Sequence, residues 1–157
     1  MTPPLLRMVV TGGRSFARTP PQQRLVHAAL SAAAAQAART GAWRPGTTIL
    51  LSHGACTGTD QAADAAARTM GWPRDAWPVD WAHERRTRPD TWRDAGPERN
   101  RAMLTAAPAP WALLRFPGGH GTAHCARTAH QLGIPVITIP ATVSYTHLRA
   151  HETVLDL

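Results

Sequence analysis

An apolar run leads into a glycine-rich turn in the segment Trp111-Ala112-Leu113-Leu114-Arg115-Phe116-Pro117-Gly118-Gly119-His120-Gly121-Thr122. The residues before Pro117 have the pattern of a buried strand, and Thr122 is suited to begin a helix. The glycines between them allow a ligand to approach the backbone closely. Free N–H groups and the positive end of the helix dipole then face one point, which favours an anion. The segment therefore predicts a phosphate-binding loop, and with it a nucleotide or a nucleotide-like ligand.

The same plan of strand, loop and helix repeats along the chain. We expect strands at 8–11, 48–53, 76–79, 111–116 and 134–139, and helices at 22–39, 59–70, 97–106 and 122–132. Apolar strands that alternate with helices are typical of a parallel sheet covered on both faces. The predicted fold class is α/β, a small Rossmann-like three-layer sandwich with a mainly parallel five-stranded sheet.

Composition narrows the function classes. The chain has 157 residues and a formal charge of +7, and all 17 basic residues are arginine. This bias, together with abundant alanine and proline, is typical of GC-rich coding, so the charge does not by itself indicate nucleic acid. Cys56 and Cys125 belong to no CxxC pair, and no apolar run is long enough to span a membrane. We expect a cytoplasmic protein without a membrane partner, and the composition leaves a homo-oligomer open.

The C-terminal segment 144–157 differs in amino-acid composition from the rest of the chain and contains its one tyrosine. It resembles a translated sequencing-adapter read-through, so we expect a non-native tail. The predicted domain, a single nucleotide-binding unit, is then 1–143, and the natural C-terminus is expected to be missing.

Three glycine-bearing loops follow three of the predicted strands. They hold Gly12, Gly13 and Arg14, then Gly54, Gly58 and Asp60, then the residues from Gly118 to Thr122. Ligands of such sheets bind beyond the carboxyl ends of the strands, so we expect the three loops to meet around one crevice. None of them is a dinucleotide GxGxxG or a Walker A sequence, which argues against ordinary dehydrogenase and P-loop chemistry.

Four ordered motifs carry a family resemblance: Thr11-Gly12-Gly13-Arg14-Ser15-Phe16, His53-Gly54-Ala55-Cys56-Thr57-Gly58-Thr59-Asp60, Ala95-Gly96-Pro97-Glu98-Arg99-Asn100-Arg101-Ala102-Met103 and Phe116-Pro117-Gly118-Gly119-His120-Gly121-Thr122. They resemble the YspA/YpsA-related SLOG family. The resemblance implies a Rossmann-like nucleotide-binding domain related to the Lonely Guy phosphoribohydrolases and to the DNA-processing protein DprA. It also implies that the domain senses or processes a nucleotide-derived ligand.

The resemblance leaves the reaction open. Lonely Guy enzymes use a PGGxGTxxE motif, and Cys125 stands here where the glutamate is expected. Cleavage of an N-glycosidic bond needs a carboxylate, so a binding or sensing function for a nucleotide or an ADP-ribose/NAD-derived ligand is the leading interpretation. A phosphoribohydrolase acting on nucleoside monophosphates and a DprA-like binder of single-stranded nucleic acid are the alternatives.

The predicted ligand-binding residues are Gly12, Gly13, Arg14, Gly54, Gly58, Asp60, Arg99, Asn100, Gly118, Gly119, His120, Gly121 and Thr122. Arg99 and Asn100 resemble the ERKxxM motif of the same enzymes, and Arg99 is the leading phosphate or ribose contact. Asp60 is interpreted as a helix-start residue or as a ligand for a ribose hydroxyl or a metal. Asp64 could pair with it, and Asp80 is either a turn residue or a ligand neighbour.

His120 and His124 stand four residues apart, but no second Cys/His cluster completes a tetrahedral set, so we predict no metal and no cofactor. The polar segment 81–93 mixes arginine with tryptophan. It is predicted to be a lid loop whose Trp81 or Trp92 packs against the base of the ligand, with nucleic-acid binding as the alternative.

Overall fold

The computed structural model describes residues 2–142, and the predicted tail lies outside them. The strands are β1 (Leu5–Thr11), β2 (Thr48–His53), β3 (Arg74–Ala76), β4 (Ala112–Arg115) and β5 (Val136–Thr138). The helices are α1 (Pro20–Arg39), α2 (Thr59–Thr69), α3 (Trp81–Thr87), the 3-10 turn η1 (Trp92–Asp94), α4 (Ala95–Thr105) and α5 (His120–Gln131).

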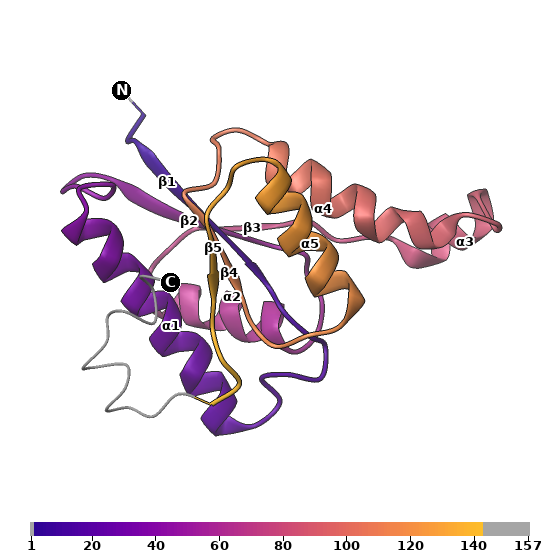
Figure 1. The fold of residues 1–157 in the computed structure, drawn as a ribbon, viewed down its shortest axis with the longest axis horizontal. Coiled ribbons are helices and arrows are strands. Elements are labelled where there is room, and N and C mark those ends of the chain that lie inside the picture. Colours follow the sequence, from indigo (N-terminus) through magenta and orange to yellow (C-terminus); the bar gives the residue numbers. More distant parts are fainter. Residues whose placement is uncertain (1, 143–157) are drawn as a thin grey trace.

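The five strands form one sheet in the order β3-β2-β1-β4-β5 (Figure 1). All four neighbouring pairs are parallel, with Met8 opposite Ala112 and Leu51 opposite Arg74. The chain builds outward from β1 to β3 on one side and then crosses to β4 and β5 on the other. The predicted Rossmann-like α/β fold is therefore confirmed, and its strand order reverses between β1 and β4.

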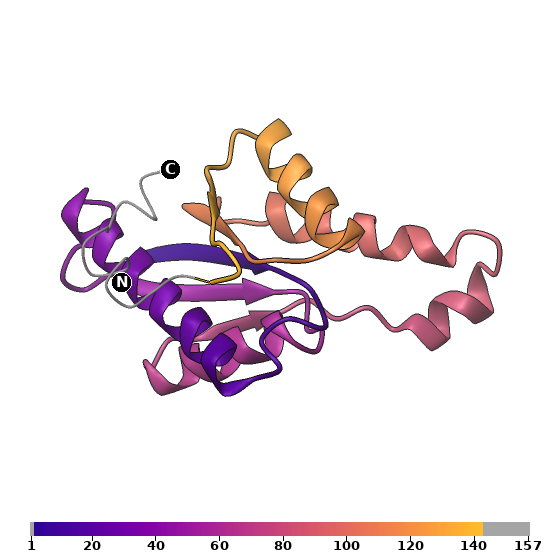
Figure 2. The same ribbon diagram turned by 60° about the horizontal axis from the view of Figure 1, so that its bottom comes forward.

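Helices cover both faces of the sheet (Figure 2). Met8 and Val10 of β1 belong to a core that includes residues of α1 and α2, whereas Val9 packs into the core of α4 and α5. Side chains alternate between the two faces of a strand, so β1 supplies both cores. Among the described residues, no helix has the length and apolar character needed to span a membrane.

Most predicted elements differ from the observed ones by one to three residues at their ends, as for β1, which begins at Leu5. Two differences have a clear physical reason. The third strand, expected at 76–79, is Arg74–Ala76, because Pro78 has no N–H with which to extend the ladder. The predicted lid loop contains the helix α3, which the apolar pattern did not reveal. Asp80 caps this helix by accepting the His83 N–H at 3.0 Å, and Arg88 forms ion pairs with Glu84 and Glu98.

A buried arginine fixes α4 to the sheet. Arg7 is 1% exposed and its Nε donates to Ser52 Oγ at 2.9 Å. Its guanidinium also donates to the carbonyl oxygens of Met103, Ala106 and Pro108, at and beyond the end of α4. Carbonyl groups at a helix C-terminus lack partners within the helix, so Arg7 satisfies them. The start of α4, which carries Arg99, is thereby held beside the sheet edge.

Candidate functional site

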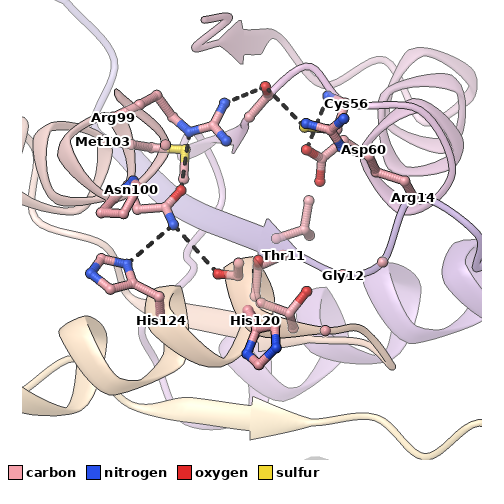
Figure 3. Close-up of a pocket in the computed structure, with 18 of the residues that line it drawn as sticks. Thr11, Gly12, Arg14, Cys56, Asp60, Arg99, Asn100, Met103, His120 and His124 are labelled. Carbon is pink, nitrogen blue, oxygen red and sulfur yellow. Dashed lines mark hydrogen bonds between the residues drawn. The ribbon is translucent and has the colours of Figure 1, made fainter. Parts of the chain in front are cut away.

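A pocket of about 530 Å³ lies beyond the carboxyl ends of β1 and β4, where the strand order reverses. Parallel α/β sheets commonly bind ligands at this place. The pocket is lined by the loop after β1, the loop after β2, the start of α4 and the start of α5 (Figure 3). Its volume lies within the range of small-molecule sites.

Most of the predicted ligand-binding residues meet here. Eleven of the thirteen line the pocket: Gly12, Gly13, Arg14, Gly54, Asp60, Arg99, Asn100, Gly119, His120, Gly121 and Thr122. Residues from three separate glycine loops thus share one cavity, as the topology of a parallel sheet requires.

Gly58 and Gly118 do not line the pocket. Gly58 has a φ of +76°, and a Cβ there would overlap the carbonyl oxygen of Arg14. A Cβ at Gly118 would overlap the Thr122 side chain and lie 2.7 Å from the Gly13 nitrogen. Both glycines allow the loops to pack against each other. The structure thus shows a packing role for both, and their role as ligand contacts stays a prediction.

The N-terminus of α5 opens into the pocket. Gly119 occupies the cap position without a side-chain hydrogen bond, and the first turn contains no acidic residue. A Cβ at Gly119 or Gly121 would meet no atom within 4 Å, so space lies in front of this helix end. Unpaired N–H groups and the helix dipole make such a position favourable for an anion.

The charges around the cavity are strongly unequal. Arg14, Arg93, Arg99 and Arg127 line it together with His120 and His124. Asp60 is the only acidic residue among the described residues that line it. Arginine suits bidentate contact with phosphate, so the pocket is electrostatically complementary to an anionic ligand.

Arg99 ties the pocket loops together. Its Nη1 donates to the carbonyl oxygens of Gly54 at 2.5 Å and Trp77 at 2.8 Å, and its Nε donates to Asn100 at 3.0 Å. These contacts join α4 to the segments that follow β2 and β3. A Cβ at Gly54 would lie 2.7 Å from Nη1, so a side chain there would displace the guanidinium. Arg99 therefore positions the pocket wall as well as contributing charge.

Asn100 joins α4 to α5. It is 7% exposed, and its Nδ2 lies 3.5 Å from the Gly121 carbonyl oxygen and 3.4 Å from His124 Nδ1. Burial, and secondly the charge of Arg127, lower the pKa of His124. The imidazole is thus held toward its neutral form, in which its Nδ1 can accept from Asn100.

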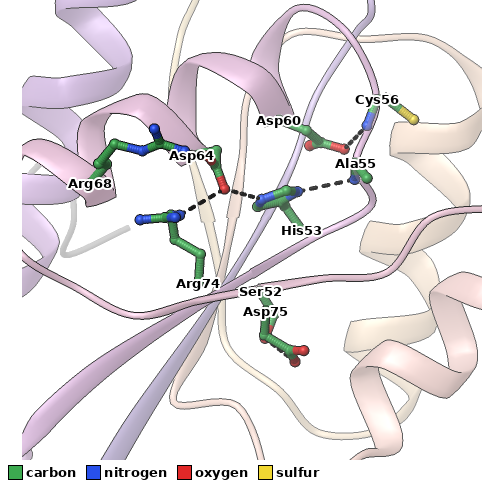
Figure 4. A network of polar contacts seen from close by, with 9 residues as sticks. All are labelled: Ser52, His53, Ala55, Cys56, Asp60, Asp64, Arg68, Arg74 and Asp75. Atoms are coloured by element: carbon green, nitrogen blue, oxygen red, sulfur yellow. Dashed lines mark hydrogen bonds and ion pairs between the residues drawn. The ribbon is translucent and has the colours of Figure 1, made fainter.

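A polar network supports the loop after β2 (Figure 4). His53 Nδ1 accepts the Ala55 N–H at 3.0 Å, so the ring proton sits on Nε2, which donates to Asp64 Oδ1 at 2.9 Å. Asp64 also pairs with Arg74 at 3.2 Å. Ala55 has a φ of +59°, and the network holds this left-handed turn. Asp64 therefore supports the loop and does not line the pocket with Asp60.

Asp60 lies at the start of α2 and is 5% exposed. Its Oδ2 accepts the Cys56 N–H at 3.2 Å, whereas Oδ1 is buried and has no hydrogen-bond partner among the described residues. Burial raises the pKa of Asp60, and the Cys56 N–H, His53, Arg99 and, least of all, the Gly54 backbone offset part of this rise. The pocket thus contains a carboxylate with an unused acceptor.

Cys125, at the position of the expected glutamate, lies away from the pocket lining. It is fully buried in the core between the sheet and the α4/α5 layer. Burial raises the pKa of its thiol to about 11, and the hydrogen bond with Thr11 opposes this rise. The side chain is therefore neutral at physiological pH and offers no negative charge to a cation-like sugar.

The tryptophans of the predicted lid pack together. Trp81 and Trp92 meet edge to face with ring centroids 6.0 Å apart. Arg85 and Arg93 lie 4.4 and 4.3 Å from the Trp92 ring, and Arg14 lies 6.0 Å from that of Trp81. Trp81 and Arg93 line the pocket, whereas Trp92 does not. Trp81 therefore lies at the pocket, where the predicted contact with a base would form, and Trp92 packs against the Trp81 ring outside the lining.

Sequence reasoning missed two cations of the lining, Arg93 and Arg127. A signal for Arg127 was present, because His120, His124 and Arg127 are spaced by four and three residues and share one face of α5. Asp80 is the cap of α3 and does not line the pocket. In the described part of the chain, no cluster of three or more His, Cys, Asp or Glu side chains could hold a metal.

No protein-family model and no curated protein matches this chain. Among solved structures, it is similar to a UDP-N-acetylglucosamine 2-epimerase, with 15% identity and a TM-score of 0.48. That match covers 87% of this chain but only 33% of the epimerase chain, so the domain spans about a third of it. A predicted subunit of tRNA methyltransferase from Methanocaldococcus jannaschii matches with 11% identity and a TM-score of 0.37, covering 94% of this chain and 74% of that one.

Proposed function

We propose that this domain binds a nucleotide or an ADP-ribose/NAD-derived ligand and acts as a sensor of it. One observation carries the proposal: the uncapped N-terminus of α5 opens into a cavity that, within residues 2–142, is lined by four arginines and a single acid. Helix N–H groups and guanidinium groups stabilise the same kind of ligand group, a phosphate. The SLOG resemblance of the four loop motifs supports the same ligand class.

Binding without turnover is favoured over N-glycosidic hydrolysis. The residue at the expected glutamate position is a neutral thiol buried in the core. Hydrolysis through a cation-like sugar requires a carboxylate beside the reacting carbon, and Asp60, the one acid among the described lining residues, comes from the start of α2 and not from the expected glutamate position on α5. Nucleic-acid binding is less favoured, because two arginines already lie against the Trp92 ring that a base would have to approach.

The test combines thermal shift with detection of released base. The domain is incubated with nucleoside monophosphates, NAD and ADP-ribose, and we expect stabilisation by at least one of them without base release. A ligand at about 100 times its Kd adds about 2.7 kcal/mol to the free energy of unfolding. Release of base would favour the hydrolase over the sensor. The absence of a thermal shift with every compound would contradict the proposal.

A matched pair of variants locates the site. Arg127→Ala removes a pocket cation from α5 and should weaken binding about tenfold or more. Arg101→Ala removes the same charge from an exposed position of α4 outside the pocket and should leave affinity close to wild type. Equal weakening by both would indicate long-range attraction by net charge instead. Steep salt dependence with a single-stranded oligonucleotide would favour the nucleic-acid alternative.

A further inference from the structure

The two carboxylate oxygens of Asp60 have different surroundings. Oδ2 accepts the Cys56 N–H at 3.2 Å and so holds the loop between β2 and α2. Oδ1 is buried without a hydrogen-bond partner in the described part of the chain. Buried polar atoms of folded proteins nearly always have partners, and an unpaired one is costly. Asp60 lines the pocket, so a hydrogen-bond donor of a bound ligand would explain why Oδ1 has no partner in the protein.

Asp60 lies close to the proposed phosphate loop. The neighbouring Thr59 donates its Oγ1 hydrogen to the Gly13 carbonyl oxygen at 3.1 Å. The Gly13 N–H in turn donates to the Pro117 carbonyl oxygen at 2.8 Å. Two hydrogen bonds thus join the start of α2 to the turn that precedes α5. Figure 3 shows Asp60 and His120 on opposite sides of the same cavity, with Thr11 between them.

The part of the ligand that meets Asp60 follows from this arrangement. In a nucleotide the sugar is bonded to the phosphate, and the base lies beyond the sugar. A carboxylate beside the phosphate loop is therefore placed for the sugar, whereas Trp81 and Arg93 line the pocket from α3 and η1. Four arginines in the lining disfavour a metal cation as the partner of Asp60.

We propose that Asp60 Oδ1 accepts a hydrogen bond from a ribose hydroxyl, so that the pocket selects ribonucleotides over deoxyribonucleotides. This inference rests on the proposed function, because it assigns a role within the same pocket. Pairing a hydroxyl with an otherwise unpaired buried carboxylate oxygen gives strong discrimination, since the analogue without the hydroxyl leaves that oxygen unpaired.

The test measures the affinities of AMP, 2′-deoxy-AMP and 3′-deoxy-AMP by calorimetry, for the wild type and for Asp60→Asn. The amide oxygen of asparagine can still accept the Cys56 N–H, whereas its NH₂ group presents a donor in place of Oδ1. The wild type should bind AMP about ten to a hundred times more tightly than at least one deoxy analogue. In Asp60→Asn the ribose hydroxyl meets a neutral amide donor in place of a charged acceptor, so the preference for AMP over that analogue should fall several-fold, while the affinity of the analogue changes little.

Asp64→Asn is the matched control, because it removes a carboxylate from the same helix. Asp64 pairs with His53 and Arg74 outside the pocket lining, so this variant should lose stability and keep the wild-type preference for AMP. Loss of the preference in both variants would assign the effect to the loop and would overturn the role of Oδ1.

The remaining outcomes separate the two proposals. Equal wild-type affinity for all three nucleotides overturns the sugar contact and leaves nucleotide binding standing. Equal weakening of all three by Asp60→Asn shows that Asp60 acts through the loop, and also overturns it. IMP, which lacks the adenine amino group, tests the base: a preference for AMP over IMP that disappears in Asp60→Asn would assign the donor to the base instead. If no nucleotide binds, both proposals fail together.

Discussion

Gly118 and Gly121 lie three residues apart in the same turn, yet a side chain would meet different surroundings at each. At Gly118 a Cβ would overlap Thr122 and approach the Gly13 nitrogen. At Gly121 a Cβ would meet no atom within 4 Å, because the position faces the space in front of α5. One glycine therefore serves the fold, and the other leaves room at the proposed anion site.

This difference predicts opposite effects for two alanine variants. Gly121→Ala should raise the free energy of unfolding by up to about 0.5 to 1 kcal/mol, because alanine favours a helix, and should weaken nucleotide binding. Gly118→Ala should lower it by about 1 to 3 kcal/mol through overpacking. Urea denaturation and calorimetry check both values. Gly121→Ala with unchanged affinity would mean that the ligand does not approach the start of α5.

The segment 81–94, which we call the arm, extends beyond the sheet and consists of α3 and η1 (Figure 1). None of its residues belongs to the two buried core clusters of the described chain. It is held by the contact between Trp81 and Trp92, by arginines on Trp92, and by the pairing of Arg88 with Glu98 at the start of α4. Substitutions in the arm are thus expected to leave the packing of the sheet intact.

Trp92→Ala tests whether the arm shapes the pocket. The variant removes the ring that supports Arg93 and Trp81, so we expect affinity to fall several-fold. The free energy of unfolding should fall by only about 1 to 2 kcal/mol, the value of the lost cation–π and ring contacts. Trp43→Ala is the contrasting control: Trp43 packs on the core far from the pocket lining, so its loss should reduce stability and leave affinity unchanged.

Elements with regular apolar patterns were predictable, and the arm was not. The strand at Thr48–His53 was predicted with its observed bounds because Ile49, Leu50 and Leu51 form an apolar run, as expected for a strand that pairs with both β1 and β3 in a covered sheet. The helix α3 has no buried residue, so no apolar stripe marks it. It depends instead on the Asp80 cap and on Arg88, whose partner Glu98 is ten residues away in the sequence. Such pairings become visible only in three dimensions.

At the scale of the whole molecule, the sheet topology explains why most of the site was predictable. Loops that follow parallel strands meet at one edge, so Gly12, Gly54 and His120 could be assigned to a common crevice from their order alone. The choice between packing and lining could not be made in this way. Gly58 lies against the Arg14 carbonyl and Arg7 lies beneath α4, and both contacts depend on the spacing of layers that the pattern does not encode.

The buried carboxylate of Asp60, whose Oδ1 has no hydrogen-bond partner among the described residues, links the site to the stability of the entire domain. Burial holds its pKa in the folded state above the usual value of 3.8, with His53 and Arg99 as the facing charged or titratable side chains that oppose the rise. The folded state therefore binds this proton more tightly than the unfolded state does. The contribution of Asp60 to stability is fully present below pH 3.8 and is lost as pH rises toward the folded-state pKa.

Asp60→Asn should remove this decrease of stability with rising pH, while the asparagine still accepts the Cys56 N–H. Near pH 3.8 the ligand-free wild type and the variant should have similar free energies of unfolding. The variant should become the more stable by about 1 to 3 kcal/mol above the folded-state pKa, the cost of an unpaired buried group. Urea denaturation of both proteins from pH 4 to pH 8 measures the difference, in which effects of other titrating groups cancel. A wild type that is the more stable protein at pH 8 would mean that Oδ1 already has a partner in the free domain.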